Sequence, residues 1–444
     1  MPEKIFLVSL GCPKNLADAE VLAGGLAEAG YGLTADEAKA GAVLINTCAF
    51  LRSAVKESEK EIRRFSALKK SGKIKKILVA GCLVERERDA LLKKFPQVDA
   101  VVGINALDKA AAALDGRGRC FIAPVSALTA PELKLRLTAP HSAYLKVADG
   151  CDNRCAYCAI PAIRGRFRSK PLDQVVGEAE DLVRSGAKEI SLIAQDTTLY
   201  GADLYGRPKL CALLKKLVKL RGLKWLRLMY VYPERVTADI LRLIRDEEKL
   251  CHYLDMPLQH ISDRVLKNMN RRSTGKTIRA KLAEIRRYVP DMALRTSFIT
   301  GFPGETEKDF SELLGFVAEA GFDNVAVFPY SREPGTPAAA LPGQLPARVK
   351  NARARSLIAA QSRVLDGKNR ALAGKTVKVL LDSPSSGRTY RDAPEIDGRV
   401  EITGAAGRKA GDFVSVRITG AAGYIRRGII APGTVPITGE RSER

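Results

Sequence analysis

Residues 151–158 read Cys-Asp-Asn-Arg-Cys-Ala-Tyr-Cys, so three thiols are separated by three and then two other residues, with Tyr157 before the last. Three thiolates of one loop can bind three irons of a 4Fe–4S cube, which leaves the fourth iron open to a small molecule. Structural zinc is the alternative, but it needs four protein ligands, and no fourth Cys or His lies nearby in the sequence. The stretch therefore predicts an iron–sulfur site held by Cys151, Cys155 and Cys158, which we name the central trio.

The totals of the chain bound its class. With 444 residues it has room for two or three domains, each with its own core. No apolar run reaches the roughly eighteen residues of a membrane span, so none is expected. The first residues, Met1–Val8, lack the features of a secretory signal. We therefore expect a cytoplasmic protein, whose nine cysteines are thiols or metal ligands rather than disulfides.

The formal net charge of +23 is large. Such a charge is typical of proteins with a polyanionic partner, and ribosomal RNA and transfer RNA are the candidates. A generally basic proteome is the alternative explanation. The charge alone does not identify the partner.

Residues 1 to about 125 alternate strand and helix patterns. This alternation predicts an α/β domain, with a parallel sheet and helices on its faces. The strands are expected at residues 5–10, 42–47, 75–80 and 100–104, and the first helix at 17–29.

Three cysteines follow these predicted strands. Cys12, Cys48 and Cys82 each stand just past the last apolar residue of a strand. Because the carboxyl ends of parallel strands share one edge, the three thiols are expected to meet there, in a second three-thiol cluster site that we name the N-terminal trio. Buried core thiols are the alternative, but these would be scattered along the strands. Cys120 has no such placement and is expected to be a core or surface thiol.

From residue 140 to about 340 the chain repeats strand, loop and helix six times, and a connecting helix extends this second domain to about 370. Six units predict a partial (β/α)6 TIM-like barrel, open on one side to a macromolecular substrate. The strands are expected at residues 143–148, 189–194, 225–231, 253–258, 293–300 and 324–328, with helices such as 172–185 and 310–320 between them.

Polar residues follow each predicted barrel strand. In such barrels the catalytic groups sit on the loops after the strands. We expect these loops to converge on one face around the central trio; after the second to sixth strands they are residues 195–198, 230–233, 257–260, 301–305 and 330–332.

Some of these residues have two explanations. The turn at 301–305, Gly-Phe-Pro-Gly-Glu, is either a tight connection or a place where backbone approaches a ligand closely. His260 is as compatible with a structural role as with a substrate-facing or catalytic one. Cys211 and Cys251 are expected to be core thiols.

The last part of the chain changes texture after a Pro/Ala-rich passage. Residues 348–370 predict a long basic helix, whose charges indicate either a solvated face or an RNA contact. Segments 376–381, 398–402 and 413–418 alternate at period two between Gly-rich turns. They predict a third domain, about 371–435, formed by a small antiparallel β-barrel of the OB-like kind used in RNA or protein recognition. Residues 434–444 are expected to be disordered.

With these residues in hand, the chain resembles the radical S-adenosylmethionine (SAM) methylthiotransferases along nearly its whole length. That family orders its domains as an N-terminal three-cysteine methylthiotransferase domain, a radical SAM core and a TRAM barrel. Residues 8–15 (Val-Ser-Leu-Gly-Cys-Pro-Lys-Asn), 194–198 (Ala-Gln-Asp-Thr-Thr) and 257–260 (Pro-Leu-Gln-His) are similar to those of the members that methylthiolate the β-carbon of an aspartate in small-subunit ribosomal protein S twelve.

The resemblance implies a set of cofactors. The central trio would hold the 4Fe–4S cluster whose open iron binds S-adenosylmethionine, the source of a 5′-deoxyadenosyl radical, and a low-potential donor would supply the electron. The N-terminal trio would hold an auxiliary 4Fe–4S cluster that carries the sulfur, methylated by a second S-adenosylmethionine. No side-chain acid or base is implied. The residues expected to cradle the cofactor are Tyr157, Gln195, Arg295, Gly301, Gly304 and Glu305.

Two other functions stay open at this point. One is methylthiolation of adenosine in tRNA, which the charge favours. The other is a non-catalytic, zinc-dependent RNA-binding protein. The ribosomal target is itself basic, so either an acidic patch on the barrel meets it or ribosomal RNA in an assembling subunit is the docking surface. A monomer without membrane contact is expected.

Overall fold

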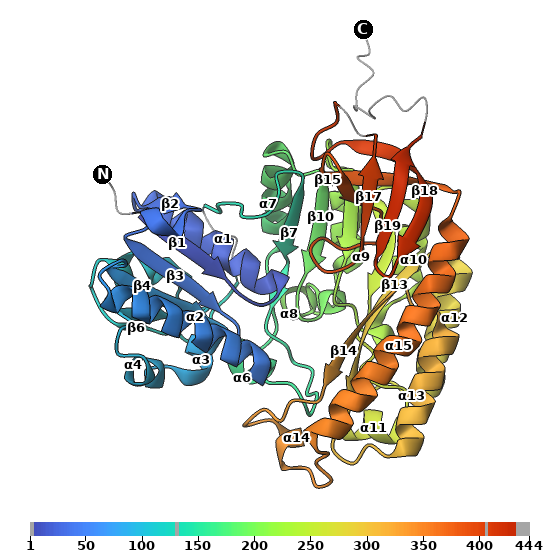
Figure 1. Ribbon diagram of the computed structural model, residues 1–444, viewed down its shortest axis with the longest axis horizontal. Helices are drawn as coiled ribbons and strands as arrows, with labels where there is room; N and C mark the ends of the chain where they lie inside the picture. The colour runs from blue at the N-terminus through green and yellow to red at the C-terminus, as the bar shows by residue number, and fades with distance from the viewer. Residues whose placement is uncertain (1–3, 129–132, 405–406, 432–444) are drawn as a thin grey trace.

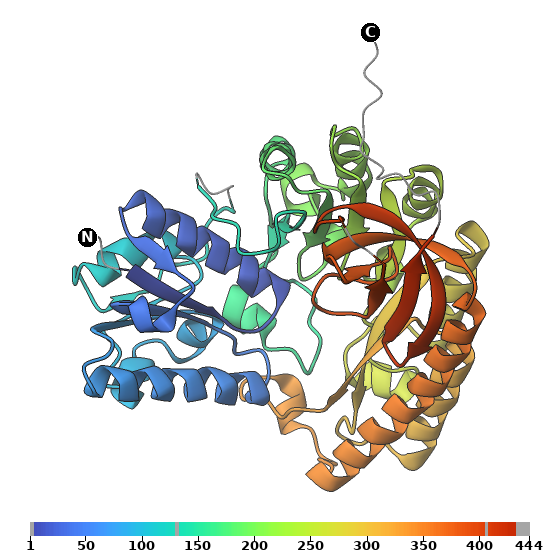
Figure 2. The ribbon, with the colours of Figure 1, turned by 45° about the horizontal axis from the view of Figure 1, so that its top comes forward.

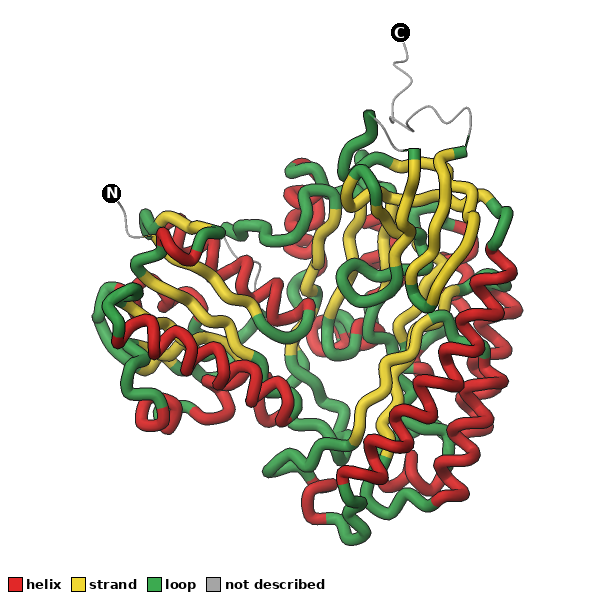
Figure 3. The backbone as a smooth tube through the Cα atoms, in the orientation of Figure 1, coloured by secondary structure: helices red, strands yellow, loops and turns green. Residues whose placement is uncertain are grey.

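The computed structural model describes residues 4–128, 133–404 and 407–431. The chain forms an N-terminal sheet with its helices, a partial barrel beside it, and a small closed barrel packed on the partial barrel (Figures 1 and 3). The predicted disorder at 434–444 lies outside the described residues. No helix in the described ranges has the length and apolar character that a membrane crossing requires.

The N-terminal sheet is parallel throughout and has six strands in the order β2-β1-β3-β4-β5-β6. The strands are β1 Lys4–Ser9, β2 Gly32–Thr34, β3 Ala42–Thr47, β4 Lys76–Gly81, β5 Ala100–Val102 and β6 Cys120–Phe121. The helices are α1 Pro13–Glu28, α2 Arg52–Lys70, α3 Cys82–Glu87, α4 Ala90–Lys94 and α5 Ala110–Leu114.

The predicted parallel sheet is confirmed, and the structure adds the edge strands β2 and β6. These strands have three and two residues, too few for a hydrophobic period to show. In the centre, every residue of β3 is buried, as expected of a strand covered on both faces. Cys120 lies exposed in the edge strand β6.

The partial barrel contains all six predicted strands, and they pair in parallel in the order β14-β13-β12-β11-β10-β7. They are β7 Ser142–Lys146, β10 Glu189–Ile193, β11 Trp225–Leu228, β12 Leu250–Asp255, β13 Ala293–Thr300 and β14 Asn324–Pro329. Strand β11 ends three residues before the predicted bound. Tyr230 has φ +58°, which an extended strand cannot contain.

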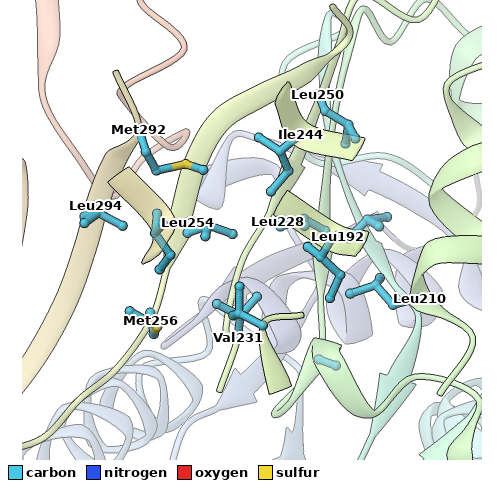
Figure 4. Packing of buried hydrophobic residues seen from close by; sticks show 14 of the residues in the cluster. Leu192, Leu210, Leu228, Val231, Ile244, Leu250, Leu254, Met256, Met292 and Leu294 are labelled. Carbon is cyan, nitrogen blue, oxygen red and sulfur yellow. The ribbon is translucent and has the colours of Figure 1, made fainter. Parts of the chain in front are cut away.

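Most of the helices between residues 160 and 372 cover the outside of this barrel, whereas the first of them packs against the N-terminal sheet. They are α6 Ile160–Arg164, α7 Leu172–Arg184, α8 Ala202–Tyr205, α9 Leu210–Leu217, α10 Ala238–Asp246, α11 Asp263–Asn268, α12 Gly275–Tyr288, α13 Glu307–Ala320, α14 Pro337–Ala340 and α15 Ala347–Leu372. Figure 4 shows part of the core between the layers, where Leu192, Leu228 and Leu254 of successive strands gather with Ile244 of α10. Two short strands, β8 Ala148–Asp149 and β9 Arg168–Ser169, pair on either side of the loop that carries the central trio.

The small barrel is closed and has five strands. They are β15 Thr376–Ser383, β16 Ser386–Arg388, β17 Arg399–Thr403, β18 Phe413–Ala422 and β19 Ile425–Ile430. The pairing of β17 with β19 is parallel and the others are antiparallel. The sequence had indicated three of these strands, because β16 is very short and β19 carries two arginines.

The connection from β16 to β17 enters the interior of the partial barrel. Tyr144 of β7 donates to the carbonyl oxygen of Pro394 at 2.7 Å, and Tyr253 of β12 donates to Asp397 at 2.7 Å. The rings of Trp225 and Phe413 meet edge to face, with centroids 4.9 Å apart. The small barrel therefore closes the interior at the end where the strands begin.

A buried carboxylate links the two barrels. Glu189 of β10 is fully buried, and its Oε1 accepts from Arg227 at 2.9 Å while its Oε2 accepts from Arg388 of the small barrel at 2.6 Å. Burial of the two cations is offset by this shared anion, and the cations hold the pKa of Glu189 below its usual value against the effect of burial.

Replacing Glu189 with Ala is expected to destabilise the folded chain by about 3–5 kcal/mol, because the buried Arg227 loses its counter-ion and Arg388 keeps only Asp382. Calorimetry or limited proteolysis between β16 and β17 would measure the loss. The control is Glu248→Ala, since Glu248 is 94% exposed and lies 3.8 Å from Lys378, and it is expected to cost less than about 0.5 kcal/mol. Equal effects of the two substitutions would contradict the assignment.

Candidate functional site

The central trio lies in the loop after β8, at the carboxyl edge of the partial barrel. Cys151 and Cys155 are buried and Cys158 is half-buried. The loop is drawn tight at Gly150, which has φ +75°, and a Cβ there would lie 2.0 Å from the carbonyl oxygen of Arg166. Only glycine fits this close approach. Gly150 therefore determines the backbone path from which the cysteine loop starts.

Polar side chains from neighbouring loops reach these sulfur atoms. Asn153 Nδ2 lies 3.5 Å from Cys151 Sγ, and the Tyr232 hydroxyl lies 3.5 Å from Cys155 Sγ. The guanidinium of Arg271 is 3.9 Å from Cys155 Sγ and stacks over the Tyr232 ring, 4.3 Å from its centroid. The loops after different strands therefore converge on the central trio, as predicted.

The thiols fit a cluster better than a single ion. Among the described residues, no three Cys, His, Asp or Glu side chains converge closely enough to hold one metal ion. A 4Fe–4S cube binds each thiolate through a different iron, so its ligands stand farther apart than those of one ion. Burial raises the pKa of Cys158 to about 12, so this group is a thiol in metal-free protein and loses its proton when metal binds.

A polar cavity of about 690 Å³ opens beside Cys155. Tyr232 and Arg271 line it together with charged side chains on both sides of the opening: Asp152, Arg154, Glu234, Arg235 and Arg272. The Nε of Arg271 is buried and has no hydrogen-bond partner among the described residues. Such a cavity suits a charged ligand placed next to the cysteine loop.

The N-terminal trio gathers at the carboxyl edge of the other sheet. Cys12 caps α1, Cys48 follows β3, and Cys82 begins α3 directly after β4. Gly11, with φ +94°, approaches so closely that a Cβ there would lie 2.8 Å from Cys48 Sγ. Burial and the neighbouring thiols raise the pKa of Cys48, and burial raises that of Cys82 to about 12. The donor set matches that of the central trio.

Side chains link the surroundings of the two trios across the seam between the sheets. Asp149, two residues before Cys151, accepts from Arg164 Nη1 at 2.9 Å, and Nη2 of the same guanidinium lies 3.3 Å from Cys82 Sγ. Lys14, beside the N-terminal trio, lies over the ring of Tyr230 from the barrel, 3.1 Å from its centroid. One buried side chain thus spans from one cysteine loop to the other sheet.

Two of the six predicted cofactor residues lie beside the central trio. Tyr157 is beside Cys155, and burial raises the pKa of its hydroxyl. Gln195 donates to Asp149 at 2.8 Å, and its Oε1 is buried without a hydrogen-bond partner in the described ranges. Both residues therefore lie close to the loop that carries the three thiols.

The other four have protein partners of their own. Arg295 pairs with Asp255 at 2.9 Å and with Asp397 of the small barrel at 3.1 Å. In the turn that starts at Gly301, Glu305 accepts from the Gly301 N–H at 2.8 Å and pairs with Arg353 of α15 at 2.7 Å.

The rest of this turn is also held by protein contacts. The Gly304 N–H donates to the carbonyl oxygen of Gly343 at 2.9 Å. A Cβ on Gly301 would lie 2.4 Å from the Lys350 side chain, so this glycine admits α15 rather than leaving open space.

His260, Cys251 and Cys211 lie among protein groups, as expected of residues with a structural role. His260 is fully buried; its Nδ1 accepts from the Ser262 N–H at 3.0 Å and its Nε2 lies 3.5 Å from Glu305. Cys251 is buried in β12, and Cys211 is half-buried in α9.

Sequence reasoning gave no role to Arg164, Tyr232 or Arg271, which contact cysteine sulfurs. Tyr232 was visible only as part of a polar loop, and Arg271 only as part of the basic run after α11. No local signal marked Arg164, because its partners are up to 149 residues away.

The chain matches three known family descriptions. Residues 4–103 match the uncharacterized protein family UPF0004, residues 145–317 match the radical SAM superfamily, and residues 373–424 match the TRAM domain. The expected fold class is confirmed by these matches together with the sheets described above.

Full-length relatives are also similar. The chain is 56% identical over 427 residues to the ribosomal protein uS12 methylthiotransferase RimO of Elusimicrobium minutum, covering 96% of this chain and 99% of the relative. It is 45% identical over 435 residues to the protein of the same name from Geobacter sulfurreducens, covering 95% and 97%.

Solved structures show the same fold at low identity. The radical SAM methyltransferase TsrM from Kitasatospora setae, with cobalamin and a [4Fe-4S] cluster bound, aligns with a TM-score of 0.55 at 16% identity, covering 76% of this chain and 77% of that one. This similarity concerns the fold alone. From the matches to full-length relatives, the chain belongs to the family of ribosomal protein uS12 methylthiotransferases named RimO.

Proposed function

We propose that this chain is a radical SAM methylthiotransferase that adds a methylthio group to the β-carbon of an aspartate in ribosomal protein uS12. The observation that carries this proposal is the identity of 56% along nearly the whole length of a relative with that name. The chain also has each part the reaction needs, since two three-cysteine sites lie on either side of one seam.

The radical SAM match supports an iron–sulfur cluster and S-adenosylmethionine as cofactors. We assign the first 4Fe–4S cluster to the central trio and a second to the N-terminal trio. When bound, these groups supply the radical that removes hydrogen from an unreactive C–H bond and the sulfur that takes its place. Two cysteines of each trio are buried and the third is half-buried.

The residues around the cavity fit the cofactor's polar groups. Arg271 and Tyr232 are placed to contact an anionic group bound next to Cys155, and Gln195 and Tyr157 border the same loop. Arg295, Gly301, Gly304 and Glu305 remain candidates as well. The contacts of the three turn residues indicate that they shape the turn after β13, whereas Arg295 lies near the start of that strand and pairs with Asp255 and Asp397.

The two alternatives receive less support. Transfer-RNA methylthiolation would use the same cysteines, but the full-length relatives carry the name of the ribosomal protein enzyme. A zinc-dependent RNA-binding protein would need four ligands for one ion, and the described thiols do not converge on one point.

Contact with ribosomal RNA would resolve how a chain of charge +23 meets a basic substrate. Helix α15 carries four exposed arginines at spacings of seven and eight residues, which we name the arginine stripe: Arg348, Arg355, Arg363 and Arg370. At about 1.5 Å per residue they lie along one face for roughly 33 Å. In the described part of the chain none of them is ion-paired, and Asp366 is the only acidic residue of α15.

The stripe continues onto the small barrel, where Lys375 and Arg417 are exposed. Figure 1 shows α15 running along the outside of the molecule and ending at this barrel. A continuous row of unpaired cations suits a phosphate backbone. We therefore place the small-subunit RNA there and the uS12 loop at the cavity, in a cytoplasmic, monomeric enzyme served by a low-potential electron donor.

The two trios predict distinct failures. Cys155→Ala is expected to abolish S-adenosylmethionine cleavage, whereas Cys82→Ala is expected to spare cleavage and stop methylthio transfer to uS12, read by peptide mass. Iron analysis should give about eight atoms per chain before substitution and about four in each variant. Cys120→Ala, which changes an exposed thiol, is the control. Continued deoxyadenosine formation by the Cys155 variant would contradict the assignment.

Substrate choice is tested by turnover under anaerobic conditions. The complete chain, with both clusters assembled, is offered uS12 within small subunits and, separately, transfer RNA. The expected product is uS12 heavier by one methylthio group, with unmodified nucleosides. Modified adenosine with unmodified uS12 would support the transfer-RNA alternative instead.

Removing the arginine stripe is expected to weaken binding to small-subunit RNA. The logarithm of the binding constant falls as the logarithm of the salt concentration rises, and each phosphate contact contributes roughly 0.7–0.9 to the steepness of that fall. Changing the four arginines to Gln should therefore make the slope shallower by about three to four. The matched control changes four ion-paired arginines of other helices to Gln, of which the first three are exposed and the last is half-buried: Arg184, Arg242, Arg245 and Arg279. Equal slopes for the two variants would reject the RNA surface.

A further inference from the structure

Arg164 is the last residue of α6, six residues after Cys158 in the chain, and it is only 1% exposed. Arginine remains charged in proteins, and an isolated buried cation is costly. Its surroundings must therefore supply anions and acceptors for most of its donors.

The guanidinium divides its hydrogen bonds between the two sheets. On the barrel side, Nη1 donates to both carboxylate oxygens of Asp149, at 3.1 and 2.9 Å. On the N-terminal side, Nη2 donates to Asp18 at 2.8 Å, to the Asn15 side-chain oxygen at 3.3 Å and to Cys82 Sγ at 3.3 Å. The fork of arginine lets one side chain bond to both oxygens of Asp149 while its other nitrogen reaches Asp18 and Cys82.

The carboxylates around Arg164 are themselves held in place. Lys146 bonds to Asp18 and lies 3.1 Å from Asp149, while Gln195 and the Gly150 N–H donate to Asp149 at 2.8 and 2.9 Å. Two cations therefore balance two carboxylates. The bond to Cys82 is an additional interaction of the guanidinium, beyond those needed to neutralise the aspartates.

Helix α6 is anchored in the N-terminal sheet although it follows the central trio in sequence. Ile163 and Ala159, which precedes the helix, belong to the hydrophobic core that contains Leu83 and Val84 of α3. Figures 1 and 2 show this short helix with the N-terminal body rather than with the barrel. The backbone of α6 thus fixes the position from which Arg164 reaches both sides.

We propose that Arg164 is a positioning residue that sets the separation of the two clusters and, through its bond to Cys82 Sγ, raises the reduction potential of the cluster held by the N-terminal trio. This inference rests on the proposed function, because it takes Cys82 as a cluster ligand. Hydrogen bonds to the ligand sulfurs are among the factors that set cluster potentials. A cationic donor favours the reduced cluster because that state carries one more negative charge.

A purely structural role of Arg164 would hold the sheets together without changing the potential. The test therefore uses the complete chain with Cys151, Cys155 and Cys158 changed to Ala, so that only the cluster of the N-terminal trio is assembled. An anaerobic redox titration followed by electron paramagnetic resonance gives its midpoint potential. In this background Arg164→Gln is expected to shift the midpoint to a lower potential, and Arg164→Lys to shift it less.

Arg426→Gln is the matched control. Arg426 is also a buried arginine, bonded to both oxygens of one aspartate, Asp392, at 2.8 Å each, but it lies in the small barrel. Its substitution is expected to leave the midpoint unchanged. If Arg164→Gln yields no folded protein, the Arg164→Lys chain, which keeps the charge, decides by the same measurement.

The outcomes separate the two proposals. If the background chain assembles no cluster of about four irons, the second-cluster assignment of the proposed function fails. If the cluster assembles and its midpoint is the same in the parent, Gln and Lys chains, the inference about Arg164 is overturned. With the central trio restored, changed magnetic coupling between the reduced clusters in Arg164→Gln would support the positioning role.

Discussion

Parallel strand pairing governs how side chains that follow different strands meet in this molecule. Neighbouring parallel strands end on the same edge of their sheet, so residues that follow different strands become neighbours. In the N-terminal sheet this brings together Cys12, Cys48 and Cys82, which are 36 and 34 residues apart in the chain. In the partial barrel it brings Tyr232 to Cys155. Arg164 then connects the two edges, since it bonds to Asp149 on one side and to Asp18 and Cys82 on the other.

An eight-stranded barrel closes on itself and fills its interior with its own side chains. The six strands of this partial barrel do not close. The small barrel covers this interior at the end where the strands begin. Asp397 of its loop accepts hydrogen bonds there from Arg295 and Tyr253. Burial raises the pKa of Asp397 to about 6. Its anionic form is favoured as pH rises above that value, so near neutral pH the interior pair carries opposite charges. The interior thus holds a charged pair at the end where the strands begin, and the central trio lies at the opposite end.

Much of this arrangement was predictable from the sequence. The six barrel strands and the two cysteine trios follow from apolar runs and from the place where each run ends. What escaped prediction has a common physical cause, which is pairing between groups far apart in sequence. Arg295 was expected to contact the cofactor because of the family resemblance, yet it pairs with Asp397 of another domain.

Short elements escaped for a different reason. Strands β2 and β6 have three and two residues, which is shorter than the roughly four to eight residues over which a strand pattern can be recognised. No pattern in the residues around Arg164 indicated a role for it, because its hydrogen-bond partners Asp18, Asn15 and Cys82 belong to the opposite sheet. Periodicity reports which face of an element is covered, but it does not report what covers it.

The position of α6 has a consequence for how the chain can be divided. Ile163 lies in the hydrophobic core of the first sheet, against residues that precede it by about eighty positions. A fragment ending near residue 125 would leave that apolar surface in water and would lack the guanidinium that meets Asp18. The first sheet therefore belongs to a discontinuous folding unit. That unit is complete only after the ribosome has synthesised the cysteine loop of the partial barrel and helix α6.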